Sequence, residues 1–324
     1  MRIFSLLAIL LSGSLVCGQQ PQNQPATQLP AVSSQEEKQP TIRVDVKLVN
    51  VFVMVTDEKG APVANLTQDD FQILEDDEPQ AISVFDRESE LPLSIVLAID
   101  TSLSTRKDLK VELESARRFV RSIVRPVDAL AVYQFSEVVD ELVPFTSDLG
   151  RIDAGIQRTH VGAATALFDA VYLAGQALDN RNGRKVIVVI TDGGDTVSSV
   201  RYAEAVRSAV QSEAIVYSII VVPIAASAGR NIGGENALIL ISHDTGGRHY
   251  YAQSDQLDEA FEQISRDLRT QYLLAYYPRK RVSSSEFRRI RVLVRGAALS
   301  GDGEEAATGF RVRHRSGYFT SKAR

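Results

Sequence analysis

The chain has 324 residues, of which 44% are hydrophobic and 24% charged, and its formal net charge at pH 7 is −5. This length suffices for about two folded domains. The mildly acidic balance, without a stripe of Lys and Arg, argues against nucleic acid as a partner.

The first 18 residues, MRIFSLLAILLSGSLVCG, have the pattern of a secretory signal peptide: one positive charge, a short apolar run and small residues. The apolar run is too short to span a bilayer stably, and no later segment reads as transmembrane. Cleavage after Gly18 would discard Cys17, the single cysteine, and leave a mature chain without thiols. A lipid anchor on Cys17 is the alternative. We therefore expect export to a secreted or periplasmic (extracytoplasmic) location.

Two segments precede the first apolar strand–helix pattern. Residues 19–40 are rich in Gln, Pro and Ser and lack aromatic residues, which predicts a disordered linker. Residues 41–90 alternate β-branched and polar residues around two turns, and the second turn is acidic, in FQILEDDEPQAISVF. This pattern predicts an all-β segment that is too short to form a robust core alone.

Residues 91–271 alternate apolar strands with amphipathic helices. We expect parallel strands at 93–100, 185–192 and 214–222, a strand pair at 129–136 and 139–146, and an edge strand at 247–252. Helices are expected over 108–124, 166–178, 202–213, 236–246 and 255–269. The alternation predicts an α/β fold with a doubly wound, mostly parallel sheet that is covered by helices on both faces.

The β pattern returns in residues 272–324, with QYLLAYYP beginning at Gln271, FRRIRVLVR and FRVRHRSGYF. A Gly-rich polar loop separates the last two. We expect these strands to pair with those of residues 41–90, which predicts one small β domain of the β-sandwich type with the α/β unit inserted into it.

Polar side chains gather where the predicted parallel strands end. Asp100 and Asp192 each close an apolar strand, Ser102 and Ser104 complete a D-x-S-x-S pattern, and Thr165 lies in a small-residue loop before a helix. The carboxyl ends of such strands form the binding crevice of an open α/β sheet. Carboxylates and hydroxyls, without imidazole or thiolate, suit Mg²⁺ or Mn²⁺. Alternatively, the serines cap the next helix and Asp192 forms a turn.

D-x-S-x-S, the threonine loop and T-D-G together resemble the metal-ion-dependent adhesion site of von Willebrand factor type A domains, over about residues 91–271. The flanks, VTDEKGAPVANLTQDDF and QYLLAYYP, resemble a bacterial group of secreted von Willebrand factor A-related proteins. The resemblance implies that the metal ligands, some acting through water, are Asp100, Ser102, Ser104, Thr165 and Asp192. It places Gly193 and Asp195 at the rim or in contact with the ligands, while Asp169 complements the dipole of the following helix.

The resemblance further implies a binding module that is not an enzyme, in which Mg²⁺ or Mn²⁺ captures an acidic group of a protein or glycan partner. Two alternatives remain: a structural extracytoplasmic protein whose metal pins loops, and a metal-dependent phosphohydrolase. Phosphatases of the haloacid dehalogenase type need a second acid where Ser102 stands. The sequence contains no G-x-S-x-G elbow, no P-loop and no G-x-G-x-x-G.

Overall fold

The computed structural model describes residues 48–87, 90–105, 107–222, 232–280, 286–295 and 310–320. The predicted signal peptide, with Cys17, and the predicted linker over 19–40 lie outside these residues. Among the helices in the described ranges, none combines the length and the apolar character needed to cross a membrane.

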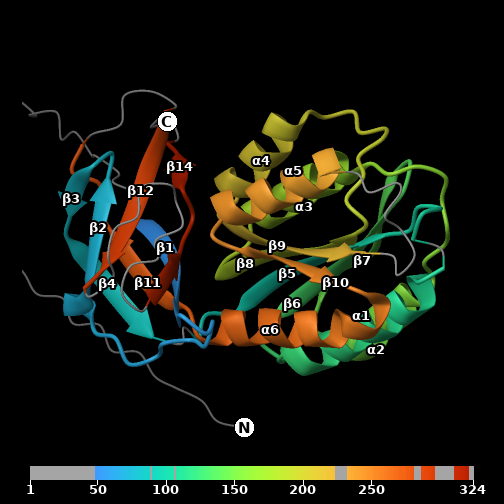
Figure 1. Cartoon of the computed structure of the whole chain (residues 1–324), viewed down its shortest axis with the longest axis horizontal. Coiled ribbons are helices and arrows are strands. Elements are labelled where there is room, and N and C mark those ends of the chain that lie inside the picture. Colours follow the sequence, from blue (N-terminus) through green and yellow to red (C-terminus); the bar gives the residue numbers. More distant parts are fainter. Residues whose placement is uncertain are drawn as a thin grey trace, which may run out of the picture. The chain divides into compact units, whose positions relative to one another are not determined.

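Six strands form one sheet in the order β10-β9-β8-β5-β6-β7 (Figure 1). All neighbours in it are parallel except β7, which runs antiparallel to β6. This confirms the predicted mostly parallel α/β sheet, with β10 at one edge. The strands are β5 (Leu93–Asp100), β6 (Ala129–Phe135), β7 (Val139–Thr146), β8 (Arg184–Thr191), β9 (Ala214–Val221) and β10 (Arg248–Ala252).

Helices cover both faces of this sheet (Figure 1). On the central strand β5, Leu97 and Ile99 pack into one apolar core, and Val96 and Ala98 pack into the other. A strand buried on both faces is apolar throughout, which is why LSIVLAI shows almost no polar alternation. One face carries α1 (Leu109–Ile123), α2 (Leu149–Ile156) and α6 (Leu257–Arg269); the other carries α3 (Leu167–Asp179), α4 (Tyr202–Gln211) and α5 (Ile232–Asp244).

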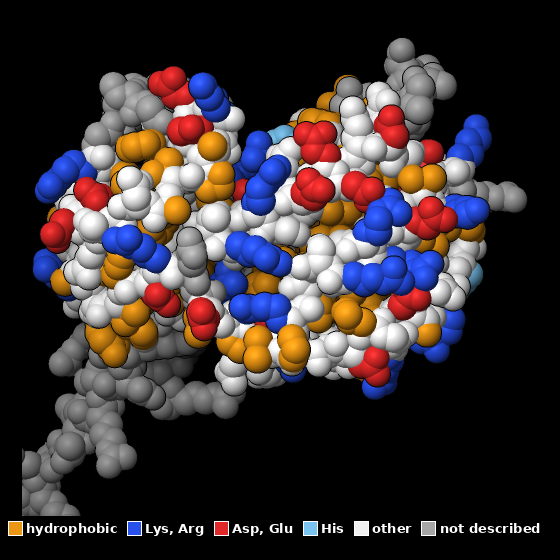
Figure 2. All heavy atoms as spheres, turned by 90° about the horizontal axis from the view of Figure 1, so that it is seen from below, with side chains coloured by type: hydrophobic (Ala, Val, Ile, Leu, Met, Phe, Trp, Pro, Cys, Tyr) orange, Lys and Arg blue, Asp and Glu red, His pale blue; other side chains and the backbone are white. Residues whose placement is uncertain are grey.

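The sequence pattern did not predict α2. This helix has eight residues and buries only Ile152, Gly155 and Ile156, so it offers too little periodicity to recognise. Its N-terminus is capped by Asp148, whose side chain accepts hydrogen bonds from two backbone N–H groups. Asp153 of α2 forms ion pairs with two arginines of α1. Figure 2 shows this side of the molecule: several Lys and Arg side chains lie close together across its middle, and Asp and Glu side chains lie beside them.

Asp128 lies directly before β6, at the end of the sheet opposite to Asp100. Its carboxylate accepts hydrogen bonds from the backbone N–H of Leu93 (2.8 Å) and of Arg125 (2.9 Å), and pairs with the Arg125 guanidinium (3.0 Å). Burial pushes the pKa of Asp128 up, but these hydrogen bonds outweigh burial and hold the pKa below its ordinary value of 3.8. Asp128 therefore stays ionised and holds the backbone at Leu93, where β5 begins.

The flanking β segments form two four-stranded antiparallel sheets, β13-β1-β11-β4 and β14-β12-β2-β3. Residues from both sheets share one apolar core, as in a β-sandwich. In each sheet a strand from before the α/β part pairs with one from after it: β1 with β11, and β2 with β12. The strands are β1 (Val49–Asp57), β2 (Phe71–Glu75), β3 (Glu78–Gln80), β4 (Ile82–Arg87), β11 (Tyr272–Tyr276), β12 (Phe287–Val294), β13 (Phe310–Arg313) and β14 (Gly317–Phe319).

The chain leaves the sandwich at Arg87 and returns at Tyr272, and these two residues are paired across β4 and β11. One expected strand is divided. FRVRHRSGYF becomes β13 and β14 in different sheets, with a corner where His314 accepts a hydrogen bond from the Val292 N–H (3.1 Å). Likewise the chain changes sheet between β3 and β4, at Ala81.

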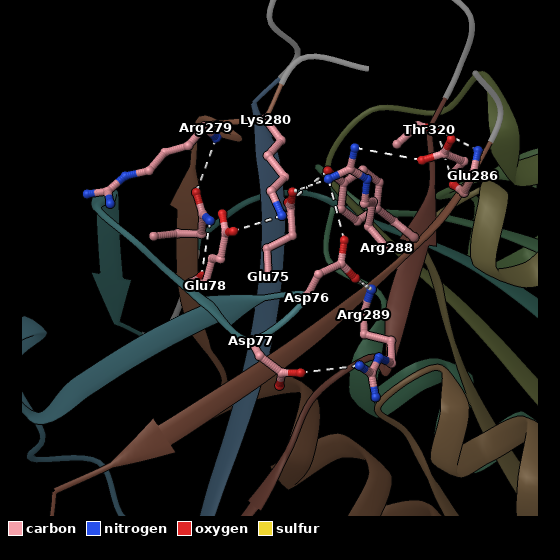
Figure 3. A network of polar contacts seen from close by, with 12 residues as sticks. Glu75, Asp76, Asp77, Glu78, Arg279, Lys280, Glu286, Arg288, Arg289 and Thr320 are labelled. Carbon is pink, nitrogen blue, oxygen red and sulfur yellow. Dashed lines mark hydrogen bonds and ion pairs between the residues drawn. The ribbon is translucent and has the colours of Figure 1, made fainter. Parts of the chain in front are cut away.

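The acidic turn between β2 and β3 is neutralised by arginines of β12 (Figure 3). Asp76 and Asp77 both have positive φ, +47° and +69°, as the tight turn of a two-residue hairpin requires. Asp77 forms ion pairs with Arg289 (3.3 Å) and Arg291 (2.7 Å). The buried Glu75 pairs with the buried Arg288 at 3.4 Å and accepts hydrogen bonds from two tyrosine hydroxyls. The charges here compensate one another within the sandwich.

Candidate metal site

Asp100 lies at the carboxyl end of β5 and is fully buried. One carboxylate oxygen accepts a hydrogen bond from the Ser102 N–H (2.9 Å) and the other from the Thr191 hydroxyl (2.6 Å). Burial raises the pKa of Asp100 to about 6, and the charge of Asp192 adds to the rise, although the hydrogen bonds act in the opposite direction. Asp100 is thus a fixed, buried carboxylate whose charged form a nearby cation would stabilise.

The loop after Asp100 brings two serine hydroxyls together. The Oγ atoms of Ser102 and Ser104 are 2.9 Å apart; Ser102 is buried and Ser104 is exposed. The Thr105 hydroxyl donates to the carbonyl oxygens of Asp100 (3.2 Å) and Ser102 (3.0 Å), which holds the loop curled. Helix α1 begins at Leu109 with Asp108 at its N-cap, so neither serine caps it.

The second strand-end carboxylate follows β8 directly. Asp192 is half-buried, and its side chain makes no hydrogen bond or ion pair with the residues that the structure describes. Gly193 has φ of +96°, a conformation that favours glycine, and its N–H donates to the Thr191 hydroxyl oxygen at 3.1 Å. Thr191 therefore links the turn that carries Asp192 to the carboxylate of Asp100. Sequence reasoning did not assign Thr191 a role, although it is the T of T-D-G.

Thr165 is buried in the loop before α3, and backbone hydrogen bonds tie this loop to both carboxylate-bearing segments. Gly162 N–H donates to the Thr101 carbonyl (2.9 Å), beside Asp100. The Thr165 carbonyl accepts from the Thr196 N–H (2.8 Å), in the loop that follows Asp192. The Thr165 N–H donates in turn to the Thr196 hydroxyl at 2.9 Å. The three segments named by the sequence pattern are therefore joined to one another at this edge of the sheet.

The two remaining acids contact the start of α3. Asp195 accepts hydrogen bonds from the Phe168 N–H (3.2 Å) and the Ser198 hydroxyl (2.5 Å). Asp169, in the first turn of α3, accepts from the backbone N–H groups of Ser199 (3.0 Å) and Val200 (2.8 Å). Both acids fix the loop after Gly193 against α3, so Asp195 contacts the loop rather than Asp100 or Asp192.

The donor set fits a hard divalent cation. Two carboxylates and three hydroxyls supply oxygen only, which suits Mg²⁺ or Mn²⁺ and not a metal that favours sulfur or nitrogen. Within the described residues no three His, Cys, Asp or Glu side chains converge as a metal cluster. A cation held here would consequently depend on the hydroxyls and on water as well as on Asp100 and Asp192.

Comparisons with known proteins agree with this architecture. Residues 95–194 match the model of the von Willebrand factor type A domain family. A von Willebrand factor type A protein from Catenulispora acidiphila has 12% identity and a TM-score of 0.50, covering 76% of this chain and 73% of that one. The conserved hypothetical protein BatB from Bacteroides thetaiotaomicron has 20% identity and a TM-score of 0.43, covering 54% of this chain and 98% of that one.

The von Willebrand factor domain of the type V pili tip protein Mfa5 from Porphyromonas gingivalis is 13% identical with a TM-score of 0.45, covering 54% of this chain and 94% of that one. No curated protein sequence matches the chain. The matched family model covers β5 from Ile95 onward, β8 and the loops that carry Asp100, Thr165 and Asp192. The segment over residues 95–194 therefore belongs to a von Willebrand factor type A domain.

Proposed function

We propose that this domain holds Mg²⁺ or Mn²⁺ and uses it to bind a carboxylate of a protein or glycan partner, without catalysing a reaction. The ligands, direct or through water, are Asp100, Ser102, Ser104, Thr165 and Asp192. The observation that carries the proposal is the buried Asp100 carboxylate beside the paired hydroxyls of Ser102 and Ser104. Two carboxylates balance the charge of a divalent cation, and hydroxyls and water leave a coordination position for an outside oxygen.

The proposal also places the protein outside the cytoplasm, either free or anchored through Cys17. The support is the sequence of residues 1–18, which has the charge, apolar run and small residues of a signal peptide. Ser104 is exposed, so a macromolecule outside the cytoplasm would be able to reach a cation held beside it.

The test is calorimetric titration of Mg²⁺ and Mn²⁺ into the wild type, Asp192→Ala and Ser102→Ala. Asp192→Ala leaves the cation with a single protein carboxylate, so we expect affinity to fall by about 100-fold or more. Ser102→Ala removes a neutral donor that water can replace, so its loss is smaller. Asp69→Ala, at an exposed acid of the sandwich, is the matched control and binds as the wild type does.

Partner capture is tested with immobilised peptides that differ only in carrying Glu or Gln. Binding to the Glu peptides that is lost in EDTA and in Asp192→Ala supports the proposal. Equal metal affinity of the wild type and Asp192→Ala would overturn the site. Metal binding without any metal-dependent preference for carboxylate would favour the structural alternative, in which the ion only pins loops.

A further inference from the structure

Glu112 is a buried carboxylate that the adhesion-type ligand set leaves unexplained. It lies in the first turn of α1, on the apolar stripe that also contains Leu109, Ala116 and Phe119. Its exposed fraction is 0%, and among the residues that the structure describes neither of its carboxylate oxygens has a hydrogen-bond partner. A buried carboxylate without donors is costly, because burial removes the water that would otherwise bond to it.

The surroundings of Glu112 point to the strand-end site. Two hydrogen bonds link helix α1 to that site. The Leu109 N–H donates to the Thr105 carbonyl (2.9 Å), and the Thr105 hydroxyl donates to the Asp100 carbonyl (3.2 Å). One turn later, the Glu112 N–H donates to the Asp108 carbonyl (3.0 Å). Burial first, and then the charges of Asp100, Asp108 and Asp192, raise the pKa of Glu112 to about 8. Its carboxyl therefore lies within the field of both predicted metal-binding carboxylates.

We infer that Glu112 is a further member of the metal site and acts on the cation through water, by accepting hydrogen bonds from metal-bound water molecules. This inference rests on the proposed function. Direct ligation does not suit the geometry, since Asp100, Asp192 and Glu112 do not converge as a metal cluster. Water on a cation is a strong donor, and buried water typically bonds to polar groups that lack other partners. Water molecules bound to the cation would then also donate hydrogen bonds to the two carboxylate oxygens of Glu112.

A purely structural role explains the position less well. A core position on an amphipathic helix is served by an apolar residue, and an unpaired buried carboxylate destabilises the fold that contains it. A cation or a hydrogen-bond donor that is present in the working state would offset this cost. In the absence of metal, replacing Glu112 by an apolar residue of similar length should therefore raise stability rather than lower it.

The test uses Glu112→Gln and Glu112→Met, with Glu114→Gln as the matched control, because Glu114 is an exposed acid two residues along the same helix. We measure Mn²⁺ affinity by calorimetry and thermal unfolding in EDTA and in saturating Mg²⁺. We expect both Glu112 variants to lose about tenfold or more in affinity, the range typical of groups that orient metal ligands. We also expect Glu112→Met to unfold at a higher temperature than the wild type in EDTA, and to gain less from Mg²⁺.

A structural residue would shift the unfolding temperature equally with and without metal, so a smaller gain from Mg²⁺ supports the inference. If Asp192→Ala loses metal binding while both Glu112 variants bind Mn²⁺ as the wild type does, this inference is wrong and the proposed function stands. If the wild type binds neither cation, both are wrong. Should Glu112→Gln fold poorly, Glu112→Met alone decides, through its affinity and its response to Mg²⁺.

Discussion

Gly234 lies in the first turn of α5 and is not one of the proposed metal ligands. We nevertheless expect Gly234→Ala, which adds a single methyl group, to disturb the metal site. A Cβ atom at Gly234 would lie 1.3 Å from the carbonyl oxygen of Gly193, which directly follows Asp192. Ordinary contacts of a Cβ begin at 3.4 Å, so Gly234→Ala has to open this contact by about 2 Å. The obstacle is backbone in a turn of positive φ, so the turn or the helix must move.

The cost has two parts. Overpacking of a buried contact typically costs about 1–3 kcal/mol, while Ala gains up to about 1 kcal/mol over Gly within a helix. We therefore expect Gly234→Ala to lower the free energy of unfolding by about 1–2 kcal/mol in EDTA. Because Mg²⁺ requires oxygen at about 2.0–2.1 Å, a shift of the turn that carries Asp192 should weaken cation binding by about 10- to 100-fold.

The matched control is Gly233→Ala, at the adjacent exposed glycine of the same helix. We expect this control to keep the wild-type Mn²⁺ affinity and to unfold at an equal or higher urea concentration. Calorimetric titration with Mn²⁺ and urea unfolding in EDTA measure the two effects separately. If Gly234→Ala binds Mn²⁺ as tightly as Gly233→Ala does and is equally stable, the packing of α5 on the Gly193 turn does not position the site.

Three other outcomes are expected. Thr191→Val removes the hydroxyl that donates to Asp100 and should lower the free energy of unfolding by about 1.5–3 kcal/mol in urea titrations at neutral pH; an unchanged midpoint would show that water replaces it. Asp128→Asn should cost a similar amount at pH 7, and its difference from the wild type should shrink as the pH falls below about 4. The reason is that the pKa of Asp128 is lower folded than unfolded, so its stabilisation is present above the unfolded value and lost as the pH drops through the folded one. A difference that does not change with pH would contradict this. Finally, we expect Mg²⁺ together with a bound Glu peptide to slow hydrogen exchange across residues 255–272 in the wild type and not in Asp192→Ala; unchanged exchange in both would rule out coupling between the site and α6.

Much of the fold could be predicted because burial on two faces leaves a plain signal. β5 is apolar along nearly its whole length and ends in Asp100, β8 is apolar from Val186 to Ile190 and is followed directly by Asp192, and amphipathic stretches mark α1, α3 and α6. Other features could not be predicted, because they are too short to show a periodic pattern or are determined by contacts between residues far apart in the sequence. Helix α2 has only eight residues. FRVRHRSGYF alternates without a break, so the corner at His314 appears only when its ring nitrogen meets the Val292 N–H.

The candidate site likewise contains residues that the sequence predicted and residues that it did not. Asp100, Ser102, Ser104, Thr165 and Asp192 stand in local patterns that can be recognised one segment at a time. Thr191 could not be assigned, because its hydroxyl reaches Asp100 only through the register that pairs Ile99 with Ile190. Glu112 and Glu114 are both acids in an amphipathic helix. The spacing of Glu112 from Leu109, Ala116 and Phe119 puts it on the apolar face of the helix, and the packing of α1 shows that it is buried while Glu114 is exposed.

The pairing of Arg87 with Tyr272 decides how the protein would carry mechanical tension. A pull applied through a captured partner would enter the sandwich along two covalent connections, at the end of β4 and at the start of β11. Because these strands are antiparallel neighbours, both connections leave from the same end of the pair. Tension then draws β4 and β11 in one direction as a unit, without separating them. The resistance falls on the hydrogen bonds between β11 and β1, which are strained together in shear rather than opened one after another.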